Sequence, residues 1–372
     1  MNILRRVSLS RLLLLCGLVV ALGVSATAIA FAVDSGPTPP AKPLANALHD
    51  ALAGAGGESI QGVSAHVKLT DHLLEGASLA SGGGEAGQLA SSPLLAGASG
   101  RLWIAKDGRV RLELQAEKGD TQILYDGHTV SLYDASTNTL YRYTIPAHEG
   151  GSAASGPSPS DHHEVPTVAK IEEAISHLNS HANVSTTPTD IAGQAAYTVR
   201  ISPKEGGSLI GGAELSFDAV HGAPLRAALY SSTSASPVLE LAATKISYGP
   251  VADSVFAFTP PPGVKIHEVS FSHHEGATGA TGATGGAGKP TLTSHGHGLS
   301  TIAVLESQTK QGAAKSGSEP LEGLPKVTIN GASATELRTE LGTLLSFERL
   351  GVRYVLAGSV TPATIEALAR GL

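Results

Sequence analysis

The chain has 372 residues, a formal charge of −7 and only 4% aromatic residues. Residues 1–33 hold three arginines and no acidic residue, so removing them leaves a formal charge of −10 on residues 34–372. A body this acidic offers no basic surface for nucleic acid, which excludes nucleic-acid binding. The 44 glycines and 21 prolines indicate a β-rich globular protein with flexible connections.

The N-terminal region is apolar. Residues 12–33 carry no charge and are long enough to cross a bilayer as a helix. Because arginines lie only before this run, the positive-inside rule predicts a cytoplasmic n-region, residues 1–11, and a single-pass cell-membrane protein with its body extracytoplasmic. The alternative is a cleaved signal peptide and a secreted body, since Ala30 and Ala32 form a small-x-small cleavage pattern.

A Pro-rich spacer follows at residues 34–43. The apolar positions of residues 44–53 have helical spacing and predict a short amphipathic helix that ends before Gly54. Residues 60–69 alternate between apolar and polar side chains, as a first strand does. Residues 76–99 are rich in Gly, Ser and Ala without a period, which predicts a long loop.

Residues 100–146 predict a meander of short strands. Asp107-Gly108 and Asp126-Gly127 suit tight hairpin turns, because glycine accepts a positive φ. The run from Arg109 to Gln115 alternates strictly, with its valine and two leucines on one face and charged or polar residues on the other. This sheet therefore has one dry face that must be covered.

A second loop, residues 148–161, leads to a predicted helix over residues 166–181. Its apolar residues share one face, which predicts a lid packed on the dry face of the sheet. Strands return from Ala196 and end with a long strand over residues 238–248, followed by the apolar run 255–258 and a triple proline.

Residues 269–298, rich in Gly, Thr and His, predict a flexible linker. Residues 299–372 predict a small, separate C-terminal α/β unit. In this unit Asn330-Gly331 predicts a turn, residues 333–341 begin with a capping-box pattern that predicts a helix, and Thr361-Pro362 predicts the start of a final helix.

The chain carries no motif typical of catalysis. Its 15 histidines are clustered in loops and the linker without cysteine or acidic partners at ligand spacing, so neither a metal nor another cofactor is expected. No nucleophile elbow or zinc-protease motif is present, and the sequence therefore predicts a protein that is not an enzyme.

The dry faces of the strands are the candidate ligand-binding site. The two predicted helices are short for so large a sheet, so lipid is one candidate for the remaining cover, and the alternative is a collapsed, purely regulatory or scaffold surface. The candidate contacts for apolar ligand are Leu102, Ile104, Val110, Leu112, Leu114, Tyr197, Val199, Leu215 and Phe217.

Several stretches resemble the LolA family of lipoprotein carriers and its relatives, including the N-terminal domain of RseB-type regulators and actinobacterial lipid-binding lipoproteins. They are ASGRLWIAKDGRVRLEL, DGHTVSLYDASTNTLYRY, LSFDAVHGAPLRAALYSS and the closing SVFAFTPPPGVKI, within residues 44–268. The resemblance implies an α+β fold, an open, strongly curved antiparallel β-sheet (a half-barrel) with helices on its concave side. It also implies an apolar cavity for a lipid or the acyl chains of a lipoprotein, or alternatively a sensing and regulatory module without lipid.

Overall fold

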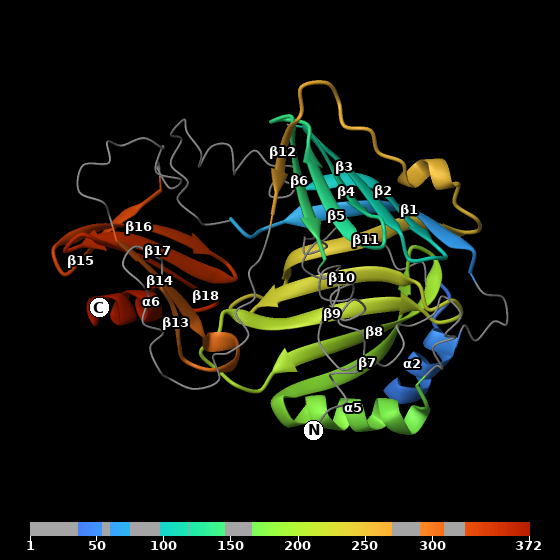
Figure 1. Cartoon of the computed structure of the whole chain (residues 1–372). Helices are drawn as coiled ribbons and strands as arrows, with labels where there is room; N and C mark the ends of the chain where they lie inside the picture. The colour runs from blue at the N-terminus through green and yellow to red at the C-terminus, as the bar shows by residue number, and fades with distance from the viewer. Residues whose placement is uncertain are drawn as a thin grey trace, which may run out of the picture.

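The computed structural model describes residues 36–53, 60–74, 97–117, 119–145, 166–269, 291–308 and 324–372. Two β-sheets, one 12-stranded and one 6-stranded, make up most of this part of the chain (Figure 1). The large sheet is open and curved, and helices pack beside it. The predicted α+β class, with an open antiparallel sheet, is therefore confirmed.

The large sheet runs in the order β12-β6-β5-β4-β3-β2-β1-β11-β10-β9-β8-β7. Neighbouring strands are antiparallel except β12, which pairs parallel to β6. The first strand of the chain thus lies in the middle of the sheet, between β2 and β11. The strands are β1 (Gly62–Asp71), β2 (Ala98–Ala105), β3 (Val110–Ala116), β4 (Gly119–Tyr125), β5 (Thr129–Asp134), β6 (Thr139–Thr144), β7 (Ala182–Ile191), β8 (Gln194–Pro203), β9 (Ile210–Asp218), β10 (Pro224–Ser231), β11 (Pro237–Tyr248) and β12 (Lys265–Glu268).

The predicted hairpin turns are confirmed. Gly108 joins β2 to β3 with φ +87°, and Gly127 joins β4 to β5 with φ +104°. The Asp126 carboxylate accepts hydrogen bonds from the backbone N–H groups of His128 (2.9 Å) and Thr129 (2.7 Å). Local turn chemistry therefore sets the register of this half of the sheet.

Two helices lie beside the large sheet, α2 (Leu44–Ala53) and α5 (Val168–His181). Helix α2 has the bounds that the sequence predicts and packs on β8 and β9. Helix α5 begins after the N-cap Thr167 and contacts α2 and the outer strand β7. Because Ile171 is buried whereas Leu178 is 38% exposed, α5 covers the margin of the sheet, and the prediction of a lid over its dry face is not met.

The segment after β11 crosses the other face of the sheet before it forms β12. The Arg111 guanidinium donates to the carbonyl of Val255 (2.7 Å), and the Phe258 ring lies 5.6 Å from that of Tyr133. The apolar run 255–258 is not a strand, because the 3-10 helix η1 (Asp253–Phe256) occupies its start. This segment accounts for the burial of Tyr133 on a face that the sequence suggests is wet.

The 6-stranded sheet runs in the order β13-β14-β18-β17-β16-β15. Its own apolar core includes Val304, Leu345, Leu356 and Ile365. Strand β13 begins at Thr291, within the stretch predicted as a linker, and residues 270–290 lie outside the described residues. The elements are β13 (Thr291–His295), η2 (Gly298–Ser300), β14 (Ile302–Gln308), β15 (Lys326–Ile329), β16 (Ala332–Thr339), β17 (Gly342–Arg349), β18 (Val352–Gly358) and α6 (Pro362–Arg370).

The prediction of a helix over residues 333–341 in this unit is wrong. The stretch from Ser333 to Leu341 forms most of β16, which pairs on both sides with β15 and β17. Tertiary pairing overrides the local capping pattern, because alternate residues such as Ala334 and Glu336 must face the core. The Asn330-Gly331 turn and the final helix, capped by Thr361, are confirmed.

The two sheets are joined by hydrogen bonds. The carbonyl of Ser359 accepts from the backbone N–H of Leu209 (2.7 Å) and from the Ser208 hydroxyl (3.0 Å). The backbone N–H of Glu340 donates to the carbonyl of Leu73 (3.1 Å). The C-terminal unit therefore rests on the β8–β9 connection and on the end of β1.

The predicted single-pass membrane topology needs correction. Residues 12–33, on which it was based, lie outside the described residues, as do the n-region 1–11 and the predicted loop 148–161. Residues 76–96 of the predicted loop 76–99 also lie outside them, whereas Ala98 and Ser99 belong to β2. Within the ranges that the structure describes, no helix is long and apolar enough to span a bilayer. Helix α5, at 14 residues the longest described helix, falls short of the roughly 20 residues that a span needs.

Candidate ligand-binding face

Strand register places the candidate residues of the sequence on one face of the large sheet, which we call the apolar face. In one direction, Leu69 lies opposite Leu241, which lies opposite Ala227. Ala227 in turn lies opposite Leu215, and Leu215 lies opposite Val199. Because residues directly opposite one another share a face, these five residues belong to one face across β1, β11, β10, β9 and β8.

The apolar face continues in the other direction. Ala65, on the same face of β1 as Leu69, lies opposite Leu102, and Leu102 lies opposite Leu112. Leu112 lies opposite Ile123, and Ile123 lies opposite Leu132. All nine predicted contacts share this face, which runs across the whole sheet. Their role as ligand contacts stays a prediction.

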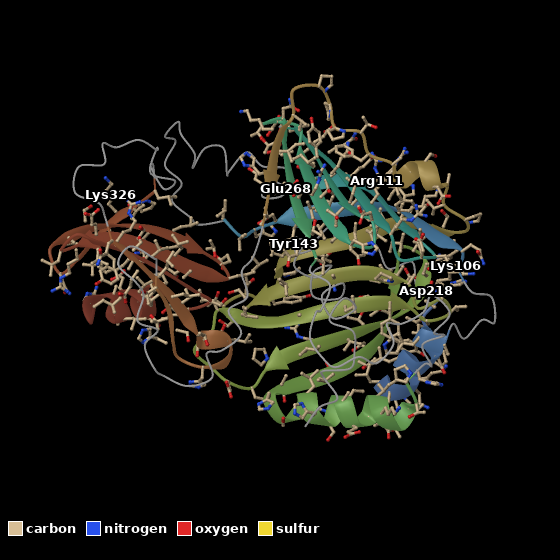
Figure 2. All side chains as sticks on the ribbon, viewed as in Figure 1. Lys106, Arg111, Tyr143, Asp218, Glu268 and Lys326 are labelled. Atoms are coloured by element: carbon tan, nitrogen blue, oxygen red, sulfur yellow. The ribbon has the colours of Figure 1, made fainter. Side chains whose placement is uncertain are left out.

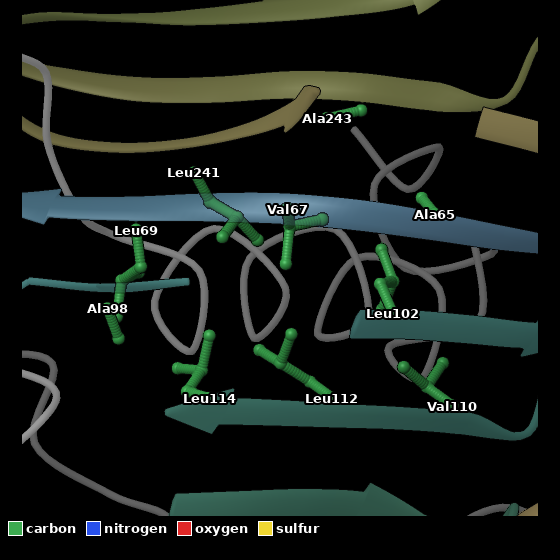
Figure 3. Close-up of a cluster of buried hydrophobic side chains, with 10 residues drawn as sticks. All are labelled: Ala65, Val67, Leu69, Ala98, Leu102, Val110, Leu112, Leu114, Leu241 and Ala243. Carbon is green, nitrogen blue, oxygen red and sulfur yellow. The ribbon is translucent and has the colours of Figure 1, made fainter. Parts of the chain in front are cut away.

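One part of the apolar face is a tightly buried cluster of strand residues (Figure 3). Leu112 and Leu114 on β3 are 2% and 1% exposed. Within the described part of the chain, no helix residue belongs to this cluster. The members are Ala65, Val67, Leu69, Ala98, Leu102, Val110, Leu112, Leu114, Leu241 and Ala243, and the half-buried Ile104 packs against them.

A second part of the apolar face is covered by α2. Ala47 packs on Tyr197, Val199 and Phe217, and the Tyr197 and Phe217 rings lie 5.9 Å apart. The Tyr197 hydroxyl donates to the carbonyl of Pro40 (2.8 Å), so part of the predicted spacer lies along the sheet. The chain itself thus fills the space above three of the nine candidate residues.

Between these two clusters the apolar face is less covered. Leu215 on β9, Leu229 on β10 and Leu239 on β11 are each half-buried. Leu229 lies opposite Leu239, which places them side by side in the middle of the sheet. The described helices leave this strip partly open.

The apolar face also opens toward its outer strands. From Leu112 the cross-strand row passes through the half-buried Ile123 and Leu132 to Tyr141 on β6, which is 43% exposed. The Tyr141 ring stacks on that of His267 on β12, with centroids 5.5 Å apart. Sequence analysis missed Ile123, Leu132 and Tyr141, although the alternation in β4 to β6 marks them.

Asp71 places a carboxyl group on the apolar face. Asp71 ends β1 opposite Leu239, and burial raises its pKa to about 6, although the N–H of Leu73 and the neighbouring His72 oppose the shift. Within the described residues, its Oδ2 atom is buried without a hydrogen-bond partner. A proton on this carboxyl would reduce the cost of keeping it in an apolar setting.

The other face of β8 to β11 carries a charge network that sequence analysis did not identify. The Arg226 guanidinium donates to Glu214 (2.7 Å) and to Glu240 (2.6 Å), and Arg200 donates to Glu214 (2.8 Å). The Tyr230 hydroxyl also donates to Glu214 (2.6 Å). Two arginines balance two glutamates, so this network ties four strands together without a net charge.

No protein-family model and no curated protein matches the chain. Similar solved structures include the MucA/MucB complex of Pseudomonas aeruginosa, at 15% identity and a TM-score of 0.39, with 87% of this chain and 95% of that chain covered. They also include the LolA superfamily protein NE2245 from Nitrosomonas europaea (11% identity, TM-score 0.19, 85% and 91% covered) and a DUF1329 family protein from Desulfovibrio piger (10%, 0.22, 85% and 91%). A MucB structure and a LolA superfamily structure are thus among the solved structures to which this chain is similar.

Proposed function

We propose that this protein binds an acyl chain, of a lipid or of a lipidated protein, on the apolar face of its large sheet, and that it does so without catalysis. The observation that supports the proposal is the continuation of the apolar face beyond its two buried clusters. Along this cross-strand row Leu112 is buried, Ile123 and Leu132 are half-buried, and Tyr141 is exposed.

The dimensions of this row suit an extended apolar ligand. Three spacings between neighbouring strands separate β3 from β6, and each is about 4.8 Å, so the row is about 14 Å long. An acyl chain lying along it would gain about 0.8 kcal/mol for each methylene that leaves water. Each further methylene that the row buries would therefore strengthen binding about fourfold.

A second candidate function is a protein-docking module without lipid, and the observation that favours it is β12. This strand is short, lies at the edge of the sheet, and all four of its residues are exposed, including Ile266. An exposed edge strand can accept a partner's strand through backbone hydrogen bonds. Here the ligand would be an extended peptide.

Native mass spectrometry of the purified protein, combined with solvent extraction, tests the proposal. The wild-type protein should carry a bound species of lipid mass, and Leu132→Asp should lose it. Leu132 is half-buried, so this variant is expected to fold, whereas its carboxylate would have to be desolvated beside the acyl chain.

Gln115→Asp provides the matched control. Gln115 is exposed, next to Leu114 on β3, and faces away from the apolar face, so this variant should retain the bound species. Wild-type protein that carries nothing, even after incubation with fatty acid, or equal loss in both variants, would reject acyl-chain binding and favour the docking module.

A further inference from the structure

A separate pocket lies on the face of the sheet opposite to the apolar face, where β11, β1 and β2 run side by side. Its volume is about 300 Å³. Four of its lining residues, on β1 and β2, alternate with members of the buried strand cluster, and Lys245 and Ser247 on β11 flank Ile246, which packs against that cluster. These six residues therefore belong to the opposite face. The lining residues are Ser64, Ala65, His66, Arg101, Trp103, Lys245, Ile246 and Ser247.

Three nitrogen-bearing side chains cross this pocket in one row. His66 lies between Lys245 on one neighbouring strand and Arg101 on the other, directly opposite both. Arg101 and Lys245 thus lie two strands apart, on either side of His66. Their two positive charges share one face of a body whose net charge is −10.

Among the described residues, no ion pair joins Arg101 or Lys245 to a carboxylate. Glu113 lies opposite Arg101 in the register, but its carboxylate pairs with Arg111 at 2.5 Å. The positive charge of the pocket therefore stays available to a ligand.

A break in the regular strand pairing helps to form the row. The register of β1 and β11 shifts between His66 and Val67, and the Thr244 hydroxyl donates to the carbonyl of His66 (3.2 Å). With Thr244 as the extra residue, Lys245 lies opposite His66 while Ala243 still faces the apolar cluster. Bulges of this kind redirect side chains in a sheet.

We propose that this pocket binds a phosphate group, as a monoester attached to a small organic group. The Arg101 guanidinium can donate two parallel hydrogen bonds to phosphate oxygens, and the Lys245 ammonium adds a point charge. The half-buried Trp103 presents an indole surface to the organic part of the ligand. The proposal is independent of ligand binding on the apolar face.

Trp103 makes the test direct, because it is the only tryptophan of the chain. Titration of the full-length protein with glycerol phosphate should change the fluorescence of Trp103 in a saturable way. Sodium chloride at matched ionic strength should not. A response that is equal for the two salts overturns the proposal.

Two variants locate the response. Arg101→Gln and Lys245→Gln should each weaken glycerol phosphate binding about tenfold or more, because each removes a charge-assisted contact. Lys106→Gln, in the exposed turn after β2 (Figure 2), should bind as the wild type does. Thermal unfolding of each variant verifies that it folds, and unchanged binding by folded Arg101→Gln overturns the proposal.

The phosphate could belong to a soluble metabolite or to a lipid headgroup, and flotation with vesicles distinguishes these sources. Binding to phosphatidylcholine vesicles that contain phosphatidic acid, lost in Arg101→Gln, would identify a headgroup. Saturable glycerol phosphate binding without vesicle binding would identify a soluble ligand. Failure with both phosphates rejects the site, whatever the acyl-chain experiment shows.

Discussion

The hydroxyl of Tyr248 donates a 2.6 Å hydrogen bond to the carboxylate of Asp218, which ties the end of β11 to the end of β9. Asp218 is 1% exposed and also accepts from the backbone N–H groups of Val220 and His221, at 2.7 Å each. The His221 ring stacks on Tyr248, with centroids 4.0 Å apart. One carboxylate thus fixes the β9–β10 turn, which lies beside α2 (Figure 2).

Tyr248→Phe should lower the free energy of unfolding by about 1 to 2 kcal/mol, because it removes one hydrogen bond from a buried carboxylate. Burial, together with the hydrogen bond to Asp218 and its charge, raises the pKa of the Tyr248 phenol. The phenol therefore stays protonated, and the expected loss is the same from neutral to moderately alkaline pH. Urea unfolding measures it. Tyr141→Phe, at an exposed position, is the control and should change stability by less than about 0.5 kcal/mol.

Asp71→Asn should stabilise the protein at neutral pH. The pKa of Asp71 is raised from 3.8 to about 6, so the folded protein binds this proton more tightly than the unfolded chain. The stabilisation from the protonated Asp71 carboxyl is fully present below pH 3.8 and is lost as the pH rises through about 6. At about pH 7.5, Asp71→Asn should raise the free energy of unfolding by about 1 to 2 kcal/mol.

Urea unfolding of wild type and Asp71→Asn between about pH 4 and pH 7.5 checks this prediction. The difference between the two proteins should grow as the pH rises. A constant difference, or a less stable variant at neutral pH, would contradict the burial of an unpaired carboxyl group on the apolar face.

Arg226→Met should destabilise the protein by about 2 to 4 kcal/mol at neutral pH, because it leaves Glu214 and Glu240 without their shared cation. Burial opposes ionisation of Glu214, but the hydrogen bonds from Arg226, Tyr230 and Arg200 outweigh burial and lower its pKa. The stabilisation by ionised Glu214 is thus fully present above pH 4.5, which is its ordinary pKa. It is lost as the pH falls through the lowered pKa of the folded protein.

The destabilisation by Arg226→Met should therefore shrink in acid, which urea unfolding at about pH 7 and about pH 3 can show. Arg200→Met is the matched control. Its side chain is 40% exposed and makes one ion pair with Glu214, so the loss should stay below about 1 kcal/mol. Equal losses in both variants would contradict the central position of Arg226.

Residues 291–372, expressed alone, should fold and melt cooperatively. The six strands and α6 enclose their own core, in which Leu345, Leu356 and Ile365 are completely buried, and a domain with its own core can fold alone. Circular dichroism during heating measures the transition. Leu356→Asp, which buries an unpaired charge, should abolish it. A fragment without a cooperative transition would show that the contacts of Ser359 and Glu340 with the large sheet are essential.

Local chemistry accounts for what the sequence by itself determined. Asp107-Gly108 and Asp126-Gly127 specify turns through backbone conformation, and strict alternation in β3 separates Leu112 from Arg111 without knowledge of any other strand. The helix over residues 44–53 follows from its apolar spacing. These signals act over a few residues, so they determine the strands, the faces and most of the candidate apolar residues.

Local signals did not suffice where a partner strand decides the secondary structure or where a crossing segment decides which side chains are buried. The capping pattern at Ser333 favours a helix, yet pairing with β15 and β17 makes this stretch a strand. The burial of Tyr133 depends on Phe258, which the chain brings across the opposite face. Backbone and side-chain contacts between distant segments outweigh local preference at both places.

Only the tertiary structure decided which residues meet. The first strand of the chain lies between β2 and β11, so His66 lies between Arg101 and Lys245, residues that are far apart in the sequence. The bulge at Thr244 completes that row. The same strand order joins two separate apolar patterns into one continuous face. Strand neighbours depend on how the whole sheet buries its apolar surface, and the sequence pattern of a single strand does not contain that information.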